Sequence, residues 1–179
     1  AAGPAAATGF GGRALQHLRF DAAQSRAAVR LPKPVSPAPP LPANADLGKG
    51  AASFITANRN FYRVDTALTV PQLNAGTWQL RVHGMVEHEL TLSFDDLLAR
   101  PLIERYITMT CVSDPVGGPY IGTARFLGAP LADLLREAGV HAGADQIVGR
   151  SSDGMTIGTP TAVIMDGRDA MLAVGMNDE

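Results

Sequence analysis

A single cysteine, Cys111, limits how this chain of 179 residues can be held together and what chemistry it can carry. One cysteine excludes an intrachain disulfide, a Cys-x-x-Cys redox pair, and zinc, iron-sulfur or haem sites that need several cysteines. The fold must therefore depend on a hydrophobic core. With 46% hydrophobic and 18% charged residues the chain can form one, and its length favours a single domain with extensions.

The charge of the chain disfavours two classes of partner. The formal net charge is -2 and the isoelectric point lies near 6.1, whereas binding to nucleic acid or to an anionic membrane requires clustered lysine and arginine. We therefore expect no nucleic-acid partner. The sequence also contains no run of about 18 or more apolar residues that could cross a membrane.

The first part of the chain reads as an extension of the domain. Residues 13–29, RALQHLRFDAAQSRAAV, are rich in helix formers and predict a short helix. Residues 31–42, LPKPVSPAPPLP, predict an extended linker or a strap over the surface, because proline removes amide donors and favours polyproline geometry. Such a segment can also be a ligand for an aromatic groove. We place the extension at residues 1–53 and the folded domain at 54–179.

The domain begins with a predicted hairpin followed by a short helix. In residues 77–86, TWQLRVHGMV, apolar and polar side chains alternate as in a half-buried strand, and residues 89–93, ELTLS, are its predicted partner. Ser93 and Asp96 have the spacing of a capping box at a helix N-terminus, and Pro101 ends that helix.

Further elements complete an α+β fold of mixed sheets with short helices. Residues 103–111, IERYITMTC, predict a strand that ends at the cysteine, and residues 130–139, PLADLLREAG, predict a helix with proline in its first turn and glycine past its end. Strands are expected within residues 145–158, which contain an Asp-Gly turn signal, and within 170–176.

Several familiar catalytic motifs are absent or out of context. Residues 9–14, GFGGRA, match a dinucleotide fingerprint, but no strand precedes them to deliver a pyrophosphate to a helix. The four histidines have no ligand spacing, and neither H-E-x-x-H nor G-x-S-x-G occurs. Zinc-dependent and serine-dependent hydrolysis are therefore disfavoured.

The surroundings of Cys111 leave more than one interpretation open. A lone cysteine after an apolar strand is often a buried, inert thiol. Here the strand opens into SDPVGGPYIG (113–122), a glycine-rich loop to which a cofactor could come close. A covalent thiol catalyst would need a neighbouring histidine, and none is close in sequence. A thiolate also suits a soft or high-valent metal that is held by other sulfurs.

Residues 108–135, TMTCVSDPVGGPYIGTARFLGAPLADLL, resemble the cysteine loop of the sulfite oxidase family of molybdenum-cofactor enzymes. Residues 60–98, 151–166 and 169–177 agree with that family in order and spacing. The resemblance covers residues 54–179 and implies an α+β sulfite-oxidase-type molybdopterin-binding domain.

The resemblance implies a role for individual residues. Cys111 matches the catalytic thiolate that ligates molybdenum beside the pterin dithiolene. Residues at other matching positions line or approach the cofactor, and hydroxyl, amide and guanidinium donors suit the acceptors of a pterin and its phosphate. These cofactor-binding candidates are Asn60, Tyr62, Arg63, Thr123, Arg125 and Ser151, of which Ser151 is expected on a strand and Arg125 has an alternative reading as a surface ion-pair residue.

The implied activity is oxygen-atom transfer at a molybdenum-molybdopterin cofactor, on a small oxyanion or sulfoxide, with electrons passing to a separate carrier such as a cytochrome. Sulfite oxidation is the favoured reaction and sulfoxide reduction is the alternative within the family. A cofactor-free binding or structural module and a thiol-based enzyme are alternatives outside it. Similar bacterial chains lie outside the cytoplasmic membrane, so we expect an extracytoplasmic protein with any membrane anchor outside this chain.

Two departures from the family pattern carry expectations of their own. Asp114 stands where family members usually have asparagine, and its carboxylate would repel an anionic cofactor unless it is protonated or turned away. The family also continues beyond the position of Glu179 into an H-G-F-P-x-R segment and a lysine-bearing strand. We therefore expect a fragment that carries only part of the cofactor site.

Overall fold

The structure is a computed structural model that describes residues 30–45, 53–64 and 72–179. Leu31–Glu179 form one compact unit, which is the unit described below. The helix predicted over 13–29 and the GFGGRA motif lie outside the described residues. The elements are η1 (Asn58–Asn60), β1 (Gln79–Val82), β2 (Leu90–Ser93), α1 (Phe94–Leu98), β3 (Ile103–Thr110), β4 (Ile121–Pro130), α2 (Leu131–Ala138), β5 (Gln146–Arg150), β6 (Thr156–Pro160), α3 (Thr161–Met165) and β7 (Met171–Met176).

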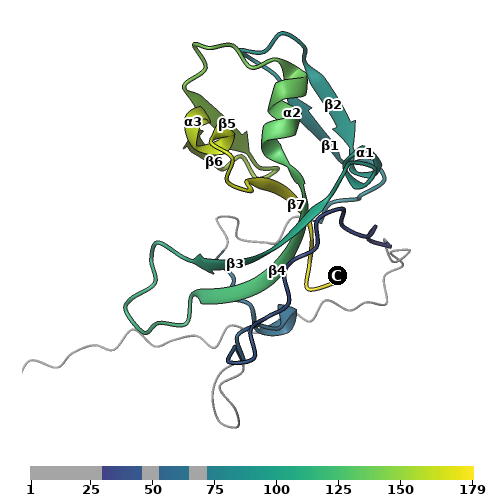
Figure 1. Cartoon of the computed structure of the whole chain (residues 1–179). Coiled ribbons are helices and arrows are strands. Elements are labelled where there is room, and N and C mark those ends of the chain that lie inside the picture. Colours follow the sequence, from purple (N-terminus) through teal and green to yellow (C-terminus); the bar gives the residue numbers. More distant parts are fainter. Residues whose placement is uncertain (1–29, 46–52, 65–71) are drawn as a thin grey trace, which may run out of the picture. The chain divides into compact units, whose positions relative to one another are not determined.

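The central feature is an antiparallel sheet of three strands in the order β3-β4-β7 (Figure 1). β3 and β4 form a long hairpin whose pairing runs from Ile103 opposite Gly128 to Thr110 opposite Ile121. β7 pairs with the C-terminal part of β4 only, from Phe126 to Pro130. One end of the hairpin therefore lies within a three-stranded sheet, and the other end is two-stranded.

The sequence pattern predicts β3 and β7 but not β4, because glycine and alanine are poor strand formers. Two glycines of β4 lie where a neighbouring group comes too close for a side chain. A Cβ on Gly122 would meet the Phe61 ring at 2.8 Å, and one on Gly128 would meet the backbone oxygen of Leu172 at 2.6 Å. Glycine at these two positions lets Phe61 and Leu172 come close to β4. These tertiary contacts outweigh the weak local preference of β4 for a strand.

The proline-rich segment is extended and pairs with the start of β3. Ser36 forms an isolated parallel bridge with Ile103, the Val35 N–H donates to the Leu102 oxygen at 2.8 Å, and the Glu104 N–H donates to the Ser36 oxygen at 2.9 Å. The strap over the surface was thus correctly predicted. Because these contacts join the strap to the main unit, the domain boundary placed at residue 54 stays a prediction.

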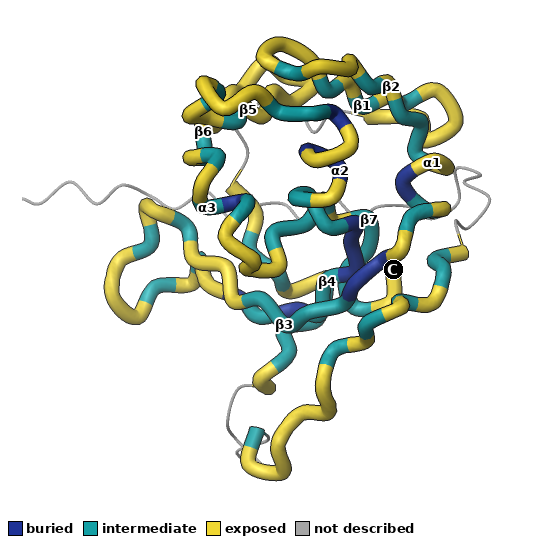
Figure 2. The backbone as a smooth tube through the Cα atoms, turned by 45° about the horizontal axis from the view of Figure 1, so that its top comes forward, coloured by how far each residue is buried: buried dark blue, intermediate teal, exposed yellow. Residues whose placement is uncertain are grey.

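The hydrophobic core next to the strap lies at the three-stranded end of the hairpin. Leu102, Leu127 and Ala129 are buried together, with Leu31 from the strap and Val174 from β7 packed against them. Figure 2 shows this buried part of β4 in dark blue, whereas the loop between β3 and β4 is largely exposed. Burial therefore falls along the hairpin from the strap toward the loop.

The predicted hairpin and its capped helix are confirmed. β1 and β2 pair antiparallel, and exposed and half-buried residues alternate along β1. Ser93 Oγ accepts the Asp96 N–H at 3.1 Å, and an Asp96 carboxylate oxygen accepts the Ser93 N–H at 2.8 Å, which completes the capping box at the start of α1. The Ser93 hydroxyl also donates to the Asp96 carboxylate at 2.6 Å, and this bond, together with the one from the Ser93 N–H, lowers the pKa of Asp96. The helix ends before Pro101, as expected.

The remaining elements differ from prediction in small ways. α2 ends at Ala138 and is followed, as predicted, by Gly139, its C-cap residue with φ 67°. Pro130 is its N-cap residue rather than part of its first turn. β5 and β6 pair antiparallel around the expected turn, where Gly154 has φ 89°. The five-residue helix α3 was not predicted, because it is too short for helical periodicity to be visible. None of the helices in the described ranges has the length and apolar character needed to span a bilayer.

Candidate functional site

Cys111 is the first residue after β3, at the end of the hairpin that carries no third strand. Its side chain is only partly buried, and the thiol is free. The loop that follows, residues 111–120, is anchored at both ends by the Cys111 N–H, which donates to the Tyr120 oxygen at 2.9 Å. The structure therefore presents the thiol at the rim of an ordered hairpin rather than inside the core, which removes the inert buried-thiol interpretation.

The Ser113 hydroxyl is the polar group beside this sulfur. Cys111 Sγ and Ser113 Oγ lie 3.1 Å apart. Hydrogen bonds from the side chain and backbone of Ser113 lower the pKa of the Cys111 thiol, while partial burial and the nearby charge of Asp114 oppose the shift. The net effect is a lowered pKa, which raises the share of thiolate at a given pH, and the thiolate is the form that ligates metals.

The carboxylate of Asp114 points into the loop and accepts a backbone hydrogen bond. Its Oδ1 accepts the Tyr120 N–H at 2.9 Å. One carboxylate oxygen is thus turned toward an amide donor, while the charge of Asp114 still acts on the Cys111 thiol, so its effect on an anionic cofactor stays a prediction. The replacement of asparagine by aspartate keeps an acceptor in the same place, since both side chains carry an Oδ1.

Tyr62 is brought next to the cysteine loop by aromatic contacts. Its ring lies 6.3 Å from that of Tyr120, and it stacks on Phe61 at 5.3 Å with an interplanar angle of 24°. Phe61 in turn contacts Phe126 of β4 edge to face. Tyr120, which links Cys111 and Tyr62, was missed in the sequence because it follows a proline in a glycine-rich loop.

Thr123 belongs to a group of threonines near the middle of the hairpin. Its Oγ1 lies 2.8 Å from Thr108 Oγ1, and its N–H donates to Thr56 Oγ1 at 3.2 Å. The Thr56 N–H returns a bond to the Thr123 oxygen at 2.8 Å. Residues 53–64, which include η1, are thereby held against β4, as can be followed in Figure 1.

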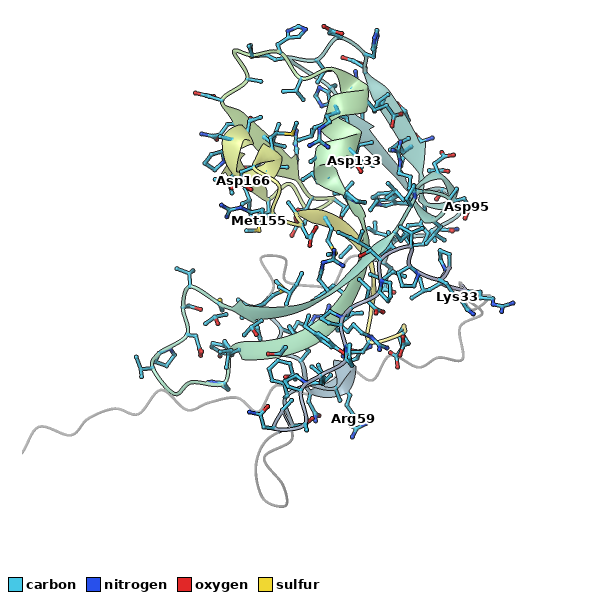
Figure 3. All side chains as sticks on the ribbon, viewed as in Figure 1. Lys33, Arg59, Asp95, Asp133, Met155 and Asp166 are labelled. Carbon is cyan, nitrogen blue, oxygen red and sulfur yellow. The ribbon has the colours of Figure 1, made fainter. Side chains whose placement is uncertain are left out.

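Asn60 and Arg63 lie on this same segment and are exposed. The Asn60 N–H donates to the Ala57 oxygen at 2.8 Å within η1. Figure 3 labels the neighbouring Arg59, whose side chain extends away from the strands. Their predicted roles in cofactor binding stay predictions.

Arg125 forms ion pairs with two carboxylates in the described part of the chain. Its Nε lies 3.2 Å from Glu104 Oε1, and its terminal nitrogen pairs with Asp178. The Arg125 N–H donates to Asn177 Oδ1 at 3.0 Å, and the Asn177 N–H donates to the Arg125 oxygen at 2.8 Å. The alternative reading of Arg125 as an ion-pair residue thus describes its present contacts, and a role at a cofactor stays a prediction.

Asn177 and Asn58 are polar residues that the sequence analysis did not single out. Asn177 adopts φ 51°, a conformation that asparagine tolerates, and its amide donates to Thr56 O at 3.0 Å and to Asn58 Oδ1 at 2.7 Å. Asn58 donates to the Met176 oxygen at 2.9 Å. These bonds connect the end of β7 to η1, and no local sequence signal indicates a pairing over such a separation.

Ser151 lies just after β5, in the turn to β6, rather than on a strand as expected. Its N–H donates to the Met155 oxygen at 2.9 Å, and its hydroxyl contacts Asp153. Figure 3 labels Met155 at this hairpin. The turn satisfies these polar groups of Ser151 locally, and its role at a cofactor stays a prediction.

No group of three or more histidine, cysteine, aspartate or glutamate residues within the described ranges has the geometry of a metal site. A thiolate that contributes one bond to a metal held by other sulfurs needs no such group. Cys111 fits that role, because it is accessible, has a lowered pKa and has a hydroxyl donor beside it.

Comparison with known proteins identifies the family of the domain. The model of the oxidoreductase molybdopterin binding domain matches residues 67–179, well over half of the chain. The chain therefore belongs to this family of molybdopterin-binding oxidoreductase domains. Among solved structures, it is similar to the sulfane dehydrogenase SoxCD from Paracoccus pantotrophus, with 26% identity and a TM-score of 0.54. The match covers 60% of this chain and 31% of that one, so the chain spans about a third of the length of that structure.

Proposed function

We propose that this chain belongs to a molybdenum-molybdopterin oxidoreductase in which Cys111 is the protein ligand of the metal and the catalytic thiolate. When bound, the cofactor supplies oxygen-atom transfer to or from a small substrate in a two-electron reaction. The observation that carries the proposal is the position of Cys111, a partly exposed thiol at the end of a rigid strand, with a hydroxyl 3.1 Å from its sulfur.

The residues around Cys111 support this assignment by their chemistry. Ser113 lowers the pKa of the Cys111 thiol, and Oδ1 of Asp114 is engaged by the Tyr120 amide. Tyr62, on the segment that follows η1, and Thr123, on β4, offer hydroxyl groups for the pterin and its phosphate. Arg125 would need to exchange its exposed partner Asp178 for the phosphate, while the more buried Glu104 remains in place.

For the substrate we propose sulfite, which is oxidised to sulfate as water supplies the oxygen and two electrons and two protons are released. The similarity to a protein named sulfane dehydrogenase supports oxidation of a sulfur compound and makes sulfane sulfur the second candidate. Sulfoxide reduction runs oxygen transfer in the opposite direction. A thiol-based reaction without metal is disfavoured, because no histidine is found hydrogen-bonded to Cys111 among the described residues.

We propose further that the electrons pass one at a time to a separate carrier such as a cytochrome, and that the protein acts outside the cytoplasm. Both proposals come from the family resemblance of the cysteine loop. Fractionation of the producing cells, with sulfite-dependent reduction of an added cytochrome in each fraction, tests them together. Recovery of the protein in the cytoplasm would contradict the location.

The first test of the proposed function measures molybdenum per chain by elemental mass spectrometry, using protein from a molybdenum-replete host. The comparison uses wild type, Cys111→Ser and the control Val116→Ser, which changes a fully exposed residue of the same loop. We expect near-stoichiometric molybdenum in wild type and control. Cys111→Ser should lose most of it, because a hydroxyl is a poor replacement for a soft thiolate ligand.

The same samples decide the reaction. Sulfite-dependent reduction of a one-electron dye supports sulfite oxidation, and thiosulfate-dependent reduction alone supports sulfane oxidation. Sulfoxide-dependent oxidation of the reduced dye supports the reductase. Absence of molybdenum from all three proteins, both in this chain and in forms extended at the C-terminus, would overturn the assignment of Cys111 and favour a cofactor-free module.

A further inference from the structure

The hairpin that carries Cys111 has one incomplete pair at its end. In an antiparallel ladder, a hydrogen-bonded pair of residues exchanges two N–H···O bonds. Cys111 and Tyr120 make only one of these, from the Cys111 N–H to the Tyr120 oxygen at 2.9 Å. The Tyr120 N–H and the Cys111 oxygen, which would form the second bond, are both directed elsewhere.

Asp114 forms hydrogen bonds with both of these groups. Its own N–H donates to the Cys111 oxygen at 3.0 Å, and its Oδ1 accepts the Tyr120 N–H at 2.9 Å. One residue thus replaces a single ladder bond with two bonds of its own. The ladder stops at Thr110 opposite Ile121, and the backbone leaves strand geometry at the cysteine.

Gly118 lies next to the Asp114 carboxylate, and the absence of a side chain at this position leaves room for it. A Cβ on Gly118 would lie 2.3 Å from Asp114 Oδ1 and 2.8 Å from the backbone oxygen of Pro115. The Gly118 N–H also donates to that Pro115 oxygen at 2.7 Å, which closes the turn. A side chain at residue 118 would therefore push the Asp114 oxygen away from the Tyr120 amide.

We propose that Asp114 is a positioning residue for Cys111, which ends the β3–β4 ladder at the cysteine and holds the thiol at the rim of the hairpin. The proposal rests on the function proposed for Cys111 as a metal ligand. In this proposal Asp114 acts through its Oδ1, which accepts the Tyr120 N–H, and the negative charge of the carboxylate is not needed. The side-chain oxygen of asparagine can accept the same N–H, whereas alanine cannot.

The test compares wild type, Asp114→Asn, Asp114→Ala and Gly118→Ala, with Asp95→Asn as a control that removes one charge from the exposed first turn of α1. Amide hydrogen exchange of Tyr120 is measured by NMR in the cofactor-free chain. We expect about tenfold faster exchange in Asp114→Ala and Gly118→Ala, because the amide loses its only side-chain acceptor. Asp114→Asn and the control should match wild type.

Molybdenum per chain in the same variants gives the second measurement. We expect Asp114→Asn to retain as much metal as wild type and Asp114→Ala to lose several-fold. Protection of amides in the β4–β7 pairing serves as the check that each variant is folded.

The outcomes separate this proposal from the proposed function. Unchanged Tyr120 exchange in Asp114→Ala would overturn the positioning role, as would a loss of metal that is equal in the asparagine and alanine variants. Absence of molybdenum from wild type would overturn the function of Cys111, while the exchange data would still decide whether Asp114 organises the loop.

Discussion

The two ends of the β3–β4 hairpin are made from the same pair of strands and differ in almost every other respect. At the end where β3 begins, Ile103 is 8% exposed and the preceding Leu102 is 1% exposed. Here the strap pairs with β3 and β7 pairs with β4. At the other end, Met109 is 45% exposed and Ile121 is 50% exposed, and the strands lead into the cysteine loop. Burial of Met109 and Ile121 therefore contributes little to the free energy of folding.

This difference shows where stability and chemistry are located. Removal of apolar surface from water stabilises the end near the strap, which fixes the register of the two strands. The same register continues along β3 and β4 to the exposed end. There Cys111 is held mainly by hydrogen bonds within its own loop. A rigid support with an open tip is a suitable arrangement for a group that must meet a cofactor.

The largest expected effect comes from Leu102→Ala at the buried end. The side chain is enclosed by Leu127, Ala129 and the strap residue Leu31, so its removal leaves a cavity. We expect a loss of about 2–5 kcal/mol in the free energy of unfolding. Denaturant unfolding followed by circular dichroism measures it, and a loss similar to that of a surface substitution would contradict the proposed core.

Gly128→Ala tests the close approach of β4 to β7. The added Cβ would meet the backbone of Leu172, which cannot rotate away, so we expect a loss of about 1–3 kcal/mol in the free energy of unfolding. The matched control is Gly149→Ala in β5, where the nearest atom would lie 3.9 Å away. Its effect should stay within about 0.5 kcal/mol. Equal effects at the two glycines would remove the steric explanation of β4.

These glycines also explain which parts of the fold could be predicted. Elements with a local signal were found, including the alternating strand β1 and the Ser93–Asp96 capping box. β4 was missed although it is the longest strand in the described part of the chain, because Gly122 and Gly128 are determined by contacts with Phe61 and Leu172. Contacts between distant segments leave no periodic pattern in the sequence of either segment.

Ser113→Ala tests the exposed end through the reactivity of Cys111. The Ser113 hydrogen bond lowers the pKa of the thiol, so its removal should move that pKa upward toward its ordinary value. Less thiolate is then present at pH 8, and alkylation of the cofactor-free chain should become several-fold slower. The pH profile of the alkylation rate should shift to higher pH.

The matched control for that measurement is Ser113→Thr, which keeps a hydroxyl and should keep the profile of wild type. Stability should change by no more than about 0.5 kcal/mol in either variant, since residue 113 is exposed. A profile that does not move in the alanine variant would show that Ser113 has no influence on the thiol.

The site was predictable to a similar extent as the fold. The position of Cys111 at a strand end beside a glycine-rich loop could be predicted from a local pattern, whereas its role as a metal ligand comes from the family resemblance and stays a proposal. The bonds that organise the site could not be predicted, since Asp114 to Tyr120 and Arg125 to Asn177 depend on how the backbone folds back. Arg125 illustrates the limit, because a guanidinium has the same appearance in sequence whether it pairs with Glu104 or with a phosphate.

The smallest expected effect is that of Val116→Ser at the tip of the loop. Val116 is fully exposed in the folded chain and is also exposed after unfolding, so the substitution changes little apolar burial. We expect a change within about 0.5 kcal/mol in the free energy of unfolding, in contrast to Leu102→Ala at the other end of the hairpin. Denaturant midpoints of the two variants, measured side by side, test the difference directly. A loss above about 1 kcal/mol in Val116→Ser would mean that the tip is covered in solution, because only a buried valine loses that much on replacement by serine.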